Sequence, residues 1–257
     1  MVLQALGLLK KFFREESGSK MRFGRIAFNL KHHSGQEMKY TNPDLSNSAL
    51  VTIDVQRDFS LPGSPAEIPG TVNVVPYIVK LLNAYRASGR PIVHLVRLYL
   101  SDGSNVDLCR REFIQSGKEL VRPGSAGAEL VQELLPTAYT KLNCPHLLGG
   151  GIQTLGPGEV VIYKPRWGAF FGTPLHDHLE GLQVNTLVVC GCNFPNCPRT
   201  TIYEASERDF RIVLVEDAVS GIYQRGKDEL RNIGVHLWST EILIKRLNTE
   251  LRVPGNA

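Results

Sequence analysis

The chain lacks several features that would assign it to well-known classes of protein. No apolar run in its 257 residues approaches the ~20 residues of a membrane-spanning helix. The net charge is only +4, and no basic stretch is interleaved with aromatic residues as in nucleic-acid-binding segments. The five cysteines form an odd set without a repeated C-x-x-C pair or a metal-ligand spacing. We therefore expect no membrane partner, no nucleic-acid partner, no cofactor and a reducing, cytoplasmic compartment.

We expect two regions of different character, an appendage of uncertain structure at residues 1–45 and one folded domain at 46–250. Residues 2–9 are mostly apolar and are followed by two lysines, which reverses the order found in a signal peptide. This segment is typical of a short amphipathic helix, or of an upstream extension if Met21 is the start. With 42% hydrophobic and 21% charged residues, the chain has the composition of an ordered globular protein.

Short apolar runs alternate with helical patterns along the domain. The runs predict strands at 49–55, 91–97, 159–163, 186–190, 211–215 and 235–238. The helical patterns lie at 72–88, 126–135, 174–182, 198–208, 228–232 and 240–247. This alternation predicts an α/β fold, a three-layer α/β/α arrangement around a mostly parallel six-stranded sheet. We expect an irregular stretch at 98–123 and a surface excursion at 136–158, because the latter is rich in Gly and Pro.

Three chemically active side chains lie at or just beyond the ends of predicted strands. Asp54 falls near the end of the first strand, Lys164 follows the third, and Cys197 follows the fourth. Ligands of open α/β sheets bind outside the carboxyl ends of the strands. The topology therefore predicts that these three residues converge, although each alone has an ordinary alternative: a loop cap, a surface lysine and a small buried thiol.

The segment around Cys197 predicts a nucleophile at the start of a helix. Gly191 breaks the preceding strand, and Pro198 suits the first helical turn, where its missing N–H costs nothing. The helix N-terminus favours the thiolate and offers N–H groups to an oxyanion. We therefore expect a lowered pKa for Cys197. A redox-sensing role of Cys197, with Cys192 as its partner, is a further alternative, although the strand–turn geometry does not obviously bring the sulfurs together.

Three motifs together resemble those of the isochorismatase-like cysteine hydrolases, which include nicotinamidases and N-carbamoylsarcosine, ureidoacrylate, biuret and streptothricin hydrolases. The segment I-D-V-Q-R-D-F at 53–59 is similar to D-x-Q-x-D-F, and K-P-R-W-G-A-F-F-G-T-P-L at 164–175 is similar to K-x-x-x-S-A-F-x-G-T-x-L. The third motif is Gly191-x5-Cys197-x3-Thr201-x3-Ala205. The resemblance covers residues 48–248.

The resemblance implies an amidohydrolase that cleaves a small amide, ureido or lactam C–N bond through a thioester on Cys197. Asp54 would be the general base and Lys164 its electrostatic partner. The family also implies a cis peptide bond between Cys192 and Asn193, and an oxyanion hole formed by the backbone N–H groups of Asn193 and Cys197. It further implies a homo-oligomer, a dimer or a tetramer. Two alternatives remain, a catalytically silent binding module and an isochorismatase-type vinyl-ether hydrolase.

Substrate binding is assigned to one arginine and several aromatic residues near these motifs. They are Phe59, Arg97, Trp167, Phe170 and Phe194. Arg97 has an equally weighted alternative, an ion pair with Asp102 or Asp107. Departures from the family pattern at Asn193–Asn196, at Pro198 and at Gly168, where the family often has serine, leave the substrate open.

We expect no catalytic metal. Nicotinamidases of this family bind a metal through an Asp and histidines after the second strand, whereas residues 97–103 contain no histidine. His176 and His178 are two residues apart and would not share a helix face. Of the other polar residues in the first motif, we expect Asp58 to position the following loop. The sequence leaves open whether the side chain of Gln56 faces the site or solvent.

Overall fold

The computed structural model describes residues 39–138 and 140–250. The predicted amphipathic helix at 2–9 and the alternative start at Met21 therefore lie outside the described residues. No helix of the described part is long and apolar enough to cross a membrane.

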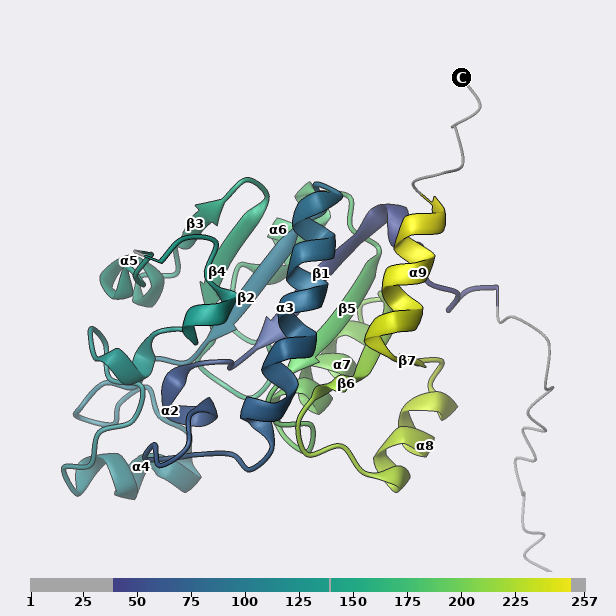
Figure 1. Cartoon of the computed structure of the whole chain (residues 1–257). Coiled ribbons are helices and arrows are strands. Elements are labelled where there is room, and N and C mark those ends of the chain that lie inside the picture. Colours follow the sequence, from purple (N-terminus) through teal and green to yellow (C-terminus); the bar gives the residue numbers. More distant parts are fainter. Residues whose placement is uncertain (1–38, 139, 251–257) are drawn as a thin grey trace, which may run out of the picture. The chain divides into compact units, whose positions relative to one another are not determined.

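One seven-stranded sheet, in the order β3-β4-β2-β1-β5-β6-β7, forms the centre of the described fold (Figure 1). The strands are β1 (Ser48–Ile53), β2 (Ile92–Val96), β3 (Ile152–Gly156), β4 (Glu159–Tyr163), β5 (Thr186–Gly191), β6 (Arg211–Val219) and β7 (His236–Trp238). All neighbouring pairs are parallel except β3 and β4, which are antiparallel. The six predicted strands are all present.

The seventh strand, β3, corrects the predicted strand count. It lies at the sheet edge within the predicted surface excursion, and its residues are partly exposed. By contrast, every residue of β1, β2 and β5 is buried, as expected for central parallel strands that helices cover on both faces. A short, half-exposed edge strand carries no continuous apolar run, so its pairing with β4 decides its conformation.

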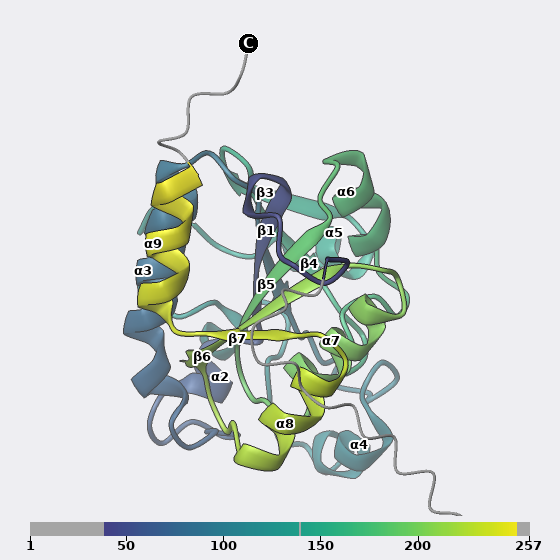
Figure 2. The same cartoon turned by 90° about the vertical axis from the view of Figure 1, so that its right-hand side faces the viewer.

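Helices cover both faces of the sheet, as Figure 2 shows edge-on. On one face, α3 (Thr71–Ala87) and α9 (Thr240–Glu250) pack against each other and against β6. On the other face lie α6 (Leu175–Gly181), α7 (Cys197–Ser206) and α8 (Gln224–Asn232), which contribute Leu179, Ile202 and Leu230 to one buried cluster with the strands. The predicted three-layer α/β/α fold is thus confirmed.

The segments beside the sheet differ most from prediction. The predicted irregular stretch contains α4 (Leu108–Gln115), and α5 (Cys144–Leu148) precedes β3. The helix predicted at 126–135 is absent; two 3-10 turns, η2 (Ala126–Ala128) and η3 (Gln132–Leu134), stand there. Between them Leu130 forms an antiparallel bridge with Gln56, which requires extended backbone. The remaining short elements are η1 (Leu45–Asn47) and α2 (Arg57–Ser60).

The strand order places a topological switch point between β1 and β5. From β1 the chain builds the sheet outward through β2 and β4, and it then returns to add β5, β6 and β7 on the other side. A crevice at the carboxyl ends of such a strand pair is the usual ligand site of an open α/β sheet. Asp54 directly follows β1, and Cys197 follows β5 by a six-residue interval.

Candidate active site

Asp54 and Lys164 form a buried ion pair at the carboxyl edge of the sheet. The Nζ atom of Lys164 lies 2.9 Å from Oδ2 of Asp54, and the side chains are 0% and 5% exposed. Lys164 also donates to the backbone carbonyls of Arg166 and Trp167, each at 3.3 Å. Three acceptors thus surround an ammonium group that has three protons, which offsets the cost of burying its charge.

The second carboxylate oxygen of Asp54 is left without a partner. Its Oδ1 is buried and accepts no hydrogen bond from the described residues. Asp54 itself has a φ of +54°, a left-handed conformation that is uncommon for a residue other than glycine. A buried, unpartnered carboxylate oxygen beside a thiol is suited to accepting the proton of that thiol.

Cys197 is the first residue of α7 and is only 6% exposed. Burial and the Asp54 carboxylate raise the pKa of its thiol to about 11, and the charges of Lys164 and Arg97 oppose that rise. The expectation of a lowered pKa is therefore wrong. The helix N-terminus is present as predicted, but desolvation and a neighbouring negative charge outweigh it. The resting nucleophile is a neutral thiol that needs a base.

The turn between β5 and α7 brings two backbone N–H groups beside the thiol. Gly191 has a φ of +117°, and a Cβ atom there would lie 2.3 Å from the carbonyl oxygen of Ile53. The next peptide bond, between Cys192 and Asn193, is cis, at the position that the family resemblance implies. Among the described residues, the N–H groups of Asn193 and Cys197 have no recorded acceptor. Such groups can bind a negatively charged oxygen.

Asp54, Asn193 and Cys197 line one narrow cavity. Its lining consists of Asp54, Phe59, Ile68, Arg110, Trp167, Cys192, Asn193 and Cys197. The water-accessible space is about 10 Å³, roughly enough for one water molecule. A substrate therefore enters only when side chains at the mouth of the cavity move.

The aromatic residues predicted to bind substrate separate into two groups. Phe59 and Trp167 line the cavity. Phe170 packs against Phe210 at 5.8 Å between ring centroids, and Phe194 packs against Tyr223 at 5.4 Å. Both of these rings belong to the buried core, and neither lines the cavity.

Arg97 is buried in an ion pair. Its guanidinium contacts Asp107, which is the second of the two alternatives stated for this residue, and donates to the hydroxyl of Tyr99 at 2.9 Å. With only 1% of its surface exposed, Arg97 does not line the cavity. It still affects the site through its charge, which lowers the pKa of Cys197 against the larger effects of burial and Asp54.

Two cavity residues were missed in the sequence, Ile68 and Arg110. Ile68 lies in the Gly/Pro-rich loop before α3, and Arg110 lies on α4, which the sequence did not predict. Neither residue belongs to a motif, so only the packing of these segments over the strand ends brings them to the site. Cys192 also lines the cavity, and its thiol donates to the carbonyl of Asp54 at 3.0 Å.

Three other motif residues lie outside the cavity lining and contact neighbouring segments. The amide of Gln56 is buried and bridges the backbone of Arg97 and Ala128, so it faces neither the cavity nor solvent. Asp58 accepts the N–H of Val121 at 2.6 Å, which positions the loop. Gly168, where the family often has serine, lies against the Glu204 carboxylate, and a Cβ atom there would be 2.1 Å from Oε2.

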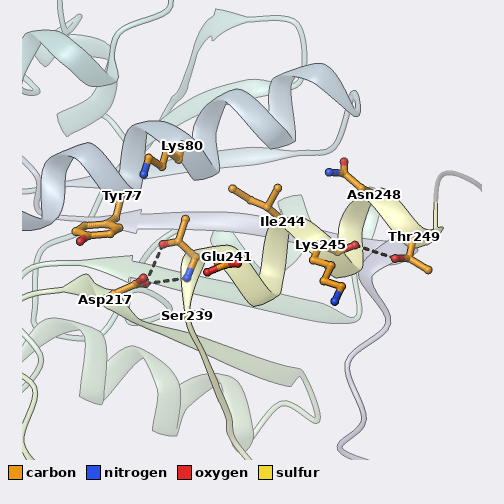
Figure 3. Close-up of a pocket in the computed structure, with 10 residues that line it drawn as sticks. Tyr77, Lys80, Asp217, Ser239, Glu241, Ile244, Lys245, Asn248 and Thr249 are labelled. Carbon is orange, nitrogen blue, oxygen red and sulfur yellow. Dashed lines mark hydrogen bonds between the residues drawn. The ribbon is translucent and has the colours of Figure 1, made fainter.

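A larger groove lies elsewhere, between α3 and α9 (Figure 3). Its acidic residue Asp217 is occupied by two hydrogen bonds of 2.8 Å from Thr240, and its lining contains no cysteine. The groove therefore offers no nucleophile, despite its volume of about 810 Å³. Within the described residues, no group of three or more His, Cys, Asp or Glu side chains is arranged to hold a metal ion.

Comparison with known proteins agrees with the fold and the motifs. The family model of the isochorismatase domain matches residues 48–143 and 151–241. A protein named "Probable inactive nicotinamidase" from Arabidopsis thaliana is 30% identical over 207 residues, which cover 76% of this chain and 96% of that protein. An N-carbamoylsarcosine amidase from an Arthrobacter species is 26% identical over 208 residues, which cover 78% and 71% of the two chains.

A solved structure of an isochorismatase family protein has the same fold. The crystal structure of an isochorismatase family protein from Desulfovibrio vulgaris superposes with a TM-score of 0.68 at 33% sequence identity. The match covers 79% of this chain and 98% of the other.

Proposed function

Since the chain belongs to the isochorismatase family, we propose that it is a cysteine amidohydrolase of small, non-peptide C–N bonds. The observation that carries this proposal is the cavity that Asp54 and Cys197 line together, with the Lys164 ammonium 2.9 Å from the Asp54 carboxylate. The substrate classes are amides, ureido compounds and lactams. The family contains amidohydrolases, among them the Arthrobacter relative whose name is N-carbamoylsarcosine amidase.

In the proposed reaction, Asp54 is the general base of both half-reactions. Its Oδ1 takes the thiol proton as the Cys197 sulfur attacks the carbonyl carbon, and Lys164 keeps the charge of Oδ2 compensated. The tetrahedral intermediate then collapses, and the leaving nitrogen takes the proton from Asp54. Water attacks the resulting thioester and gives its proton to Asp54, which returns it to the departing thiolate. The products are a carboxylic acid and an amine or ammonia.

The backbone N–H groups of Asn193 and Cys197 are the proposed oxyanion hole. Their lack of protein acceptors within the described residues supports this role. Donors of this kind act only once charge develops on the carbonyl oxygen, so they favour the transition state over the substrate.

The first test is a Cys197→Ala variant measured against a panel of small amides, ureido compounds, lactams and nicotinamide. Amine or ammonia release by the parent protein should fall at least about 10³-fold in the variant, because the nucleophile is gone. Intact-mass analysis of the parent protein should show an acyl adduct on Cys197. Cys109→Ala, which removes an exposed thiol, is the matched control and should leave turnover unchanged. Turnover that survives in Cys197→Ala would refute the cysteine mechanism.

A catalytically silent binding module is the second candidate, and the name of the Arabidopsis relative favours it. The two candidates differ in a measurable way. A silent module binds panel compounds without releasing amine and without gaining mass on Cys197. The predicted dimer or tetramer remains a separate expectation, which light scattering after size exclusion would test.

A further inference from the structure

The cavity contains one cation for which the site described above provides no role. Arg110 lines the cavity from α4, and its guanidinium lies 5.1 Å from the Trp167 ring and 5.6 Å from the Phe59 ring. Nη1 donates to the Tyr99 hydroxyl at 2.9 Å. Two aromatic faces and one hydrogen bond thus hold this planar group at the wall of the cavity.

Arg110 has no acidic partner within the described residues. No carboxylate oxygen there lies within 4.0 Å of its guanidinium nitrogens, whereas the other charges of the site are paired. Asp54 pairs with Lys164, and Asp107 pairs with Arg97. The site therefore carries an uncompensated positive charge at Arg110.

The position of Arg110 relative to the thiol supports a role in binding. Burial lowers the pKa of its guanidinium, but Tyr99 and the charges of Cys197 and Asp54 raise it, and the net direction is upward. Cys197 and Asp54 thus lie within its electrostatic reach. Nε and Nη2 have no recorded acceptor among the described residues, so two donors of the guanidinium fork remain for a ligand.

We propose that Arg110 binds a carboxylate of the substrate, so that the amides hydrolysed here are short acids whose carboxylate lies a few atoms from the scissile carbonyl. The proposal rests on the proposed function for the position of that carbonyl. Arginine forms bidentate, charge-assisted hydrogen bonds with carboxylates, and the aromatic walls exclude water from them. Arg110 and Cys197 line the same small cavity, so the spacer between the carboxylate and the scissile carbonyl is only a few atoms long.

The test compares two probes of nearly equal shape, the monoamide and the diamide of succinic acid. Only the monoamide carries a carboxylate. Binding is measured calorimetrically to Cys197→Ala, which cannot turn over either probe through the thiol, so the result does not depend on cysteine chemistry. The monoamide should bind about ten- to a hundredfold more tightly, as expected for a charge-assisted hydrogen-bonded pair.

Arg110→Met and Arg110→Lys in the same background then locate the interaction. Methionine should abolish the preference for the monoamide, and lysine should retain part of it because it keeps the charge without the bidentate fork. Arg111→Met is the matched control, since Arg111 is the next residue of α4 and does not line the cavity. It should keep the full preference. Circular dichroism and thermal melting verify that each variant is folded.

Equal binding of the two probes, binding of neither, or a preference that survives Arg110→Met would overturn the assignment. Failure of the proposed function gives a different pattern. In that case the monoamide still binds selectively through Arg110, while the parent protein releases no ammonia from it and gains no mass on Cys197.

Discussion

At the scale of single residues, Cys197 experiences two opposing influences. The N-terminus of α7 and Lys164 favour a thiolate, whereas burial and the Asp54 carboxylate favour the neutral thiol and prevail, with a pKa of about 11. At neutral pH the thiolate is then a minor species. A base that acts at the moment of attack is required, and Asp54 is the residue in position.

The residue-scale prediction separates the two effects of Asp54. In Asp54→Asn the negative charge that raises the pKa of Cys197 is gone, so the thiolate population increases. Iodoacetamide should alkylate Cys197 at pH 8 about tenfold faster or more, which corresponds to a pKa lower by one unit. Amide turnover should fall by about 10²- to 10⁴-fold, since the general base is lost. Peptide mass spectrometry and ammonia release measure the two rates.

The control for this prediction is Asp102→Asn, which changes an exposed aspartate in the loop after β2. It should alter neither rate. Slower alkylation in Asp54→Asn would contradict the argument that this carboxylate raises the pKa of Cys197, and unchanged amide turnover would contradict the base assignment.

At the scale of elements, the junction of β5 and α7 positions the nucleophile. Gly191 is parallel-paired with Ile53 in β1, and the two backbones approach so closely that no side chain fits. This contact sets the distance between the ends of β1 and β5, which carry Asp54 and the turn toward Cys197.

Gly191→Ala should therefore destabilise the fold by at least about 1–3 kcal/mol, the usual cost of a strained left-handed residue. The overlap of the new Cβ atom with the Ile53 carbonyl adds to this cost. Chemical denaturation measures the free energy of unfolding. Gly181→Ala is the matched control, because Gly181 lies in α6 without a positive φ, and a Cβ atom there would meet no neighbour within 4 Å. That change should be neutral or stabilising by up to about 1 kcal/mol. Equal losses in both variants would contradict the close-approach argument.

At the scale of the whole molecule, a buried polar cluster joins the sheet to the layer of α3. His94 on β2 contacts Glu159 on β4 at 2.9 Å, and Arg86 on α3 contacts the same carboxylate at 2.7 Å. Burial raises the pKa of Glu159, but the hydrogen bonds and charges of Arg86 and His94 lower it to about 2 overall.

Because the folded-state pKa of Glu159 lies below its unfolded value of 4.5, its contribution to stability is fully present above pH 4.5. That contribution is lost as the pH falls from 4.5 toward 2. Glu159→Gln should therefore show a smaller drop in melting temperature between pH 6 and pH 3 than the parent protein. Glu207→Gln, at an exposed position, should keep the full drop. An unchanged drop in Glu159→Gln would mean that this cluster does not contribute to acid sensitivity.

The sequence by itself determined the three-layer arrangement, six of the seven strands and the position of three motif residues at the strand ends. Buried parallel strands are continuous apolar runs, and their carboxyl ends meet at one edge whatever the loops do. The family resemblance located the Cys192–Asn193 bond in the same way, from the motif. These features are local in the chain or follow from topology alone.

Only the tertiary structure decided which side chains complete the cavity. The sequence assigned Arg97 to substrate binding and missed Arg110. In the structure Arg97 pairs with Asp107, whereas Arg110 has no acidic partner among the described residues, and α4 brings it to the cavity that Cys197 lines. The elevated pKa of Cys197 likewise depends on burial and on a carboxylate 143 positions earlier in the chain. Desolvation and charge pairing are sums over neighbours in space, so no local pattern of residues encodes them.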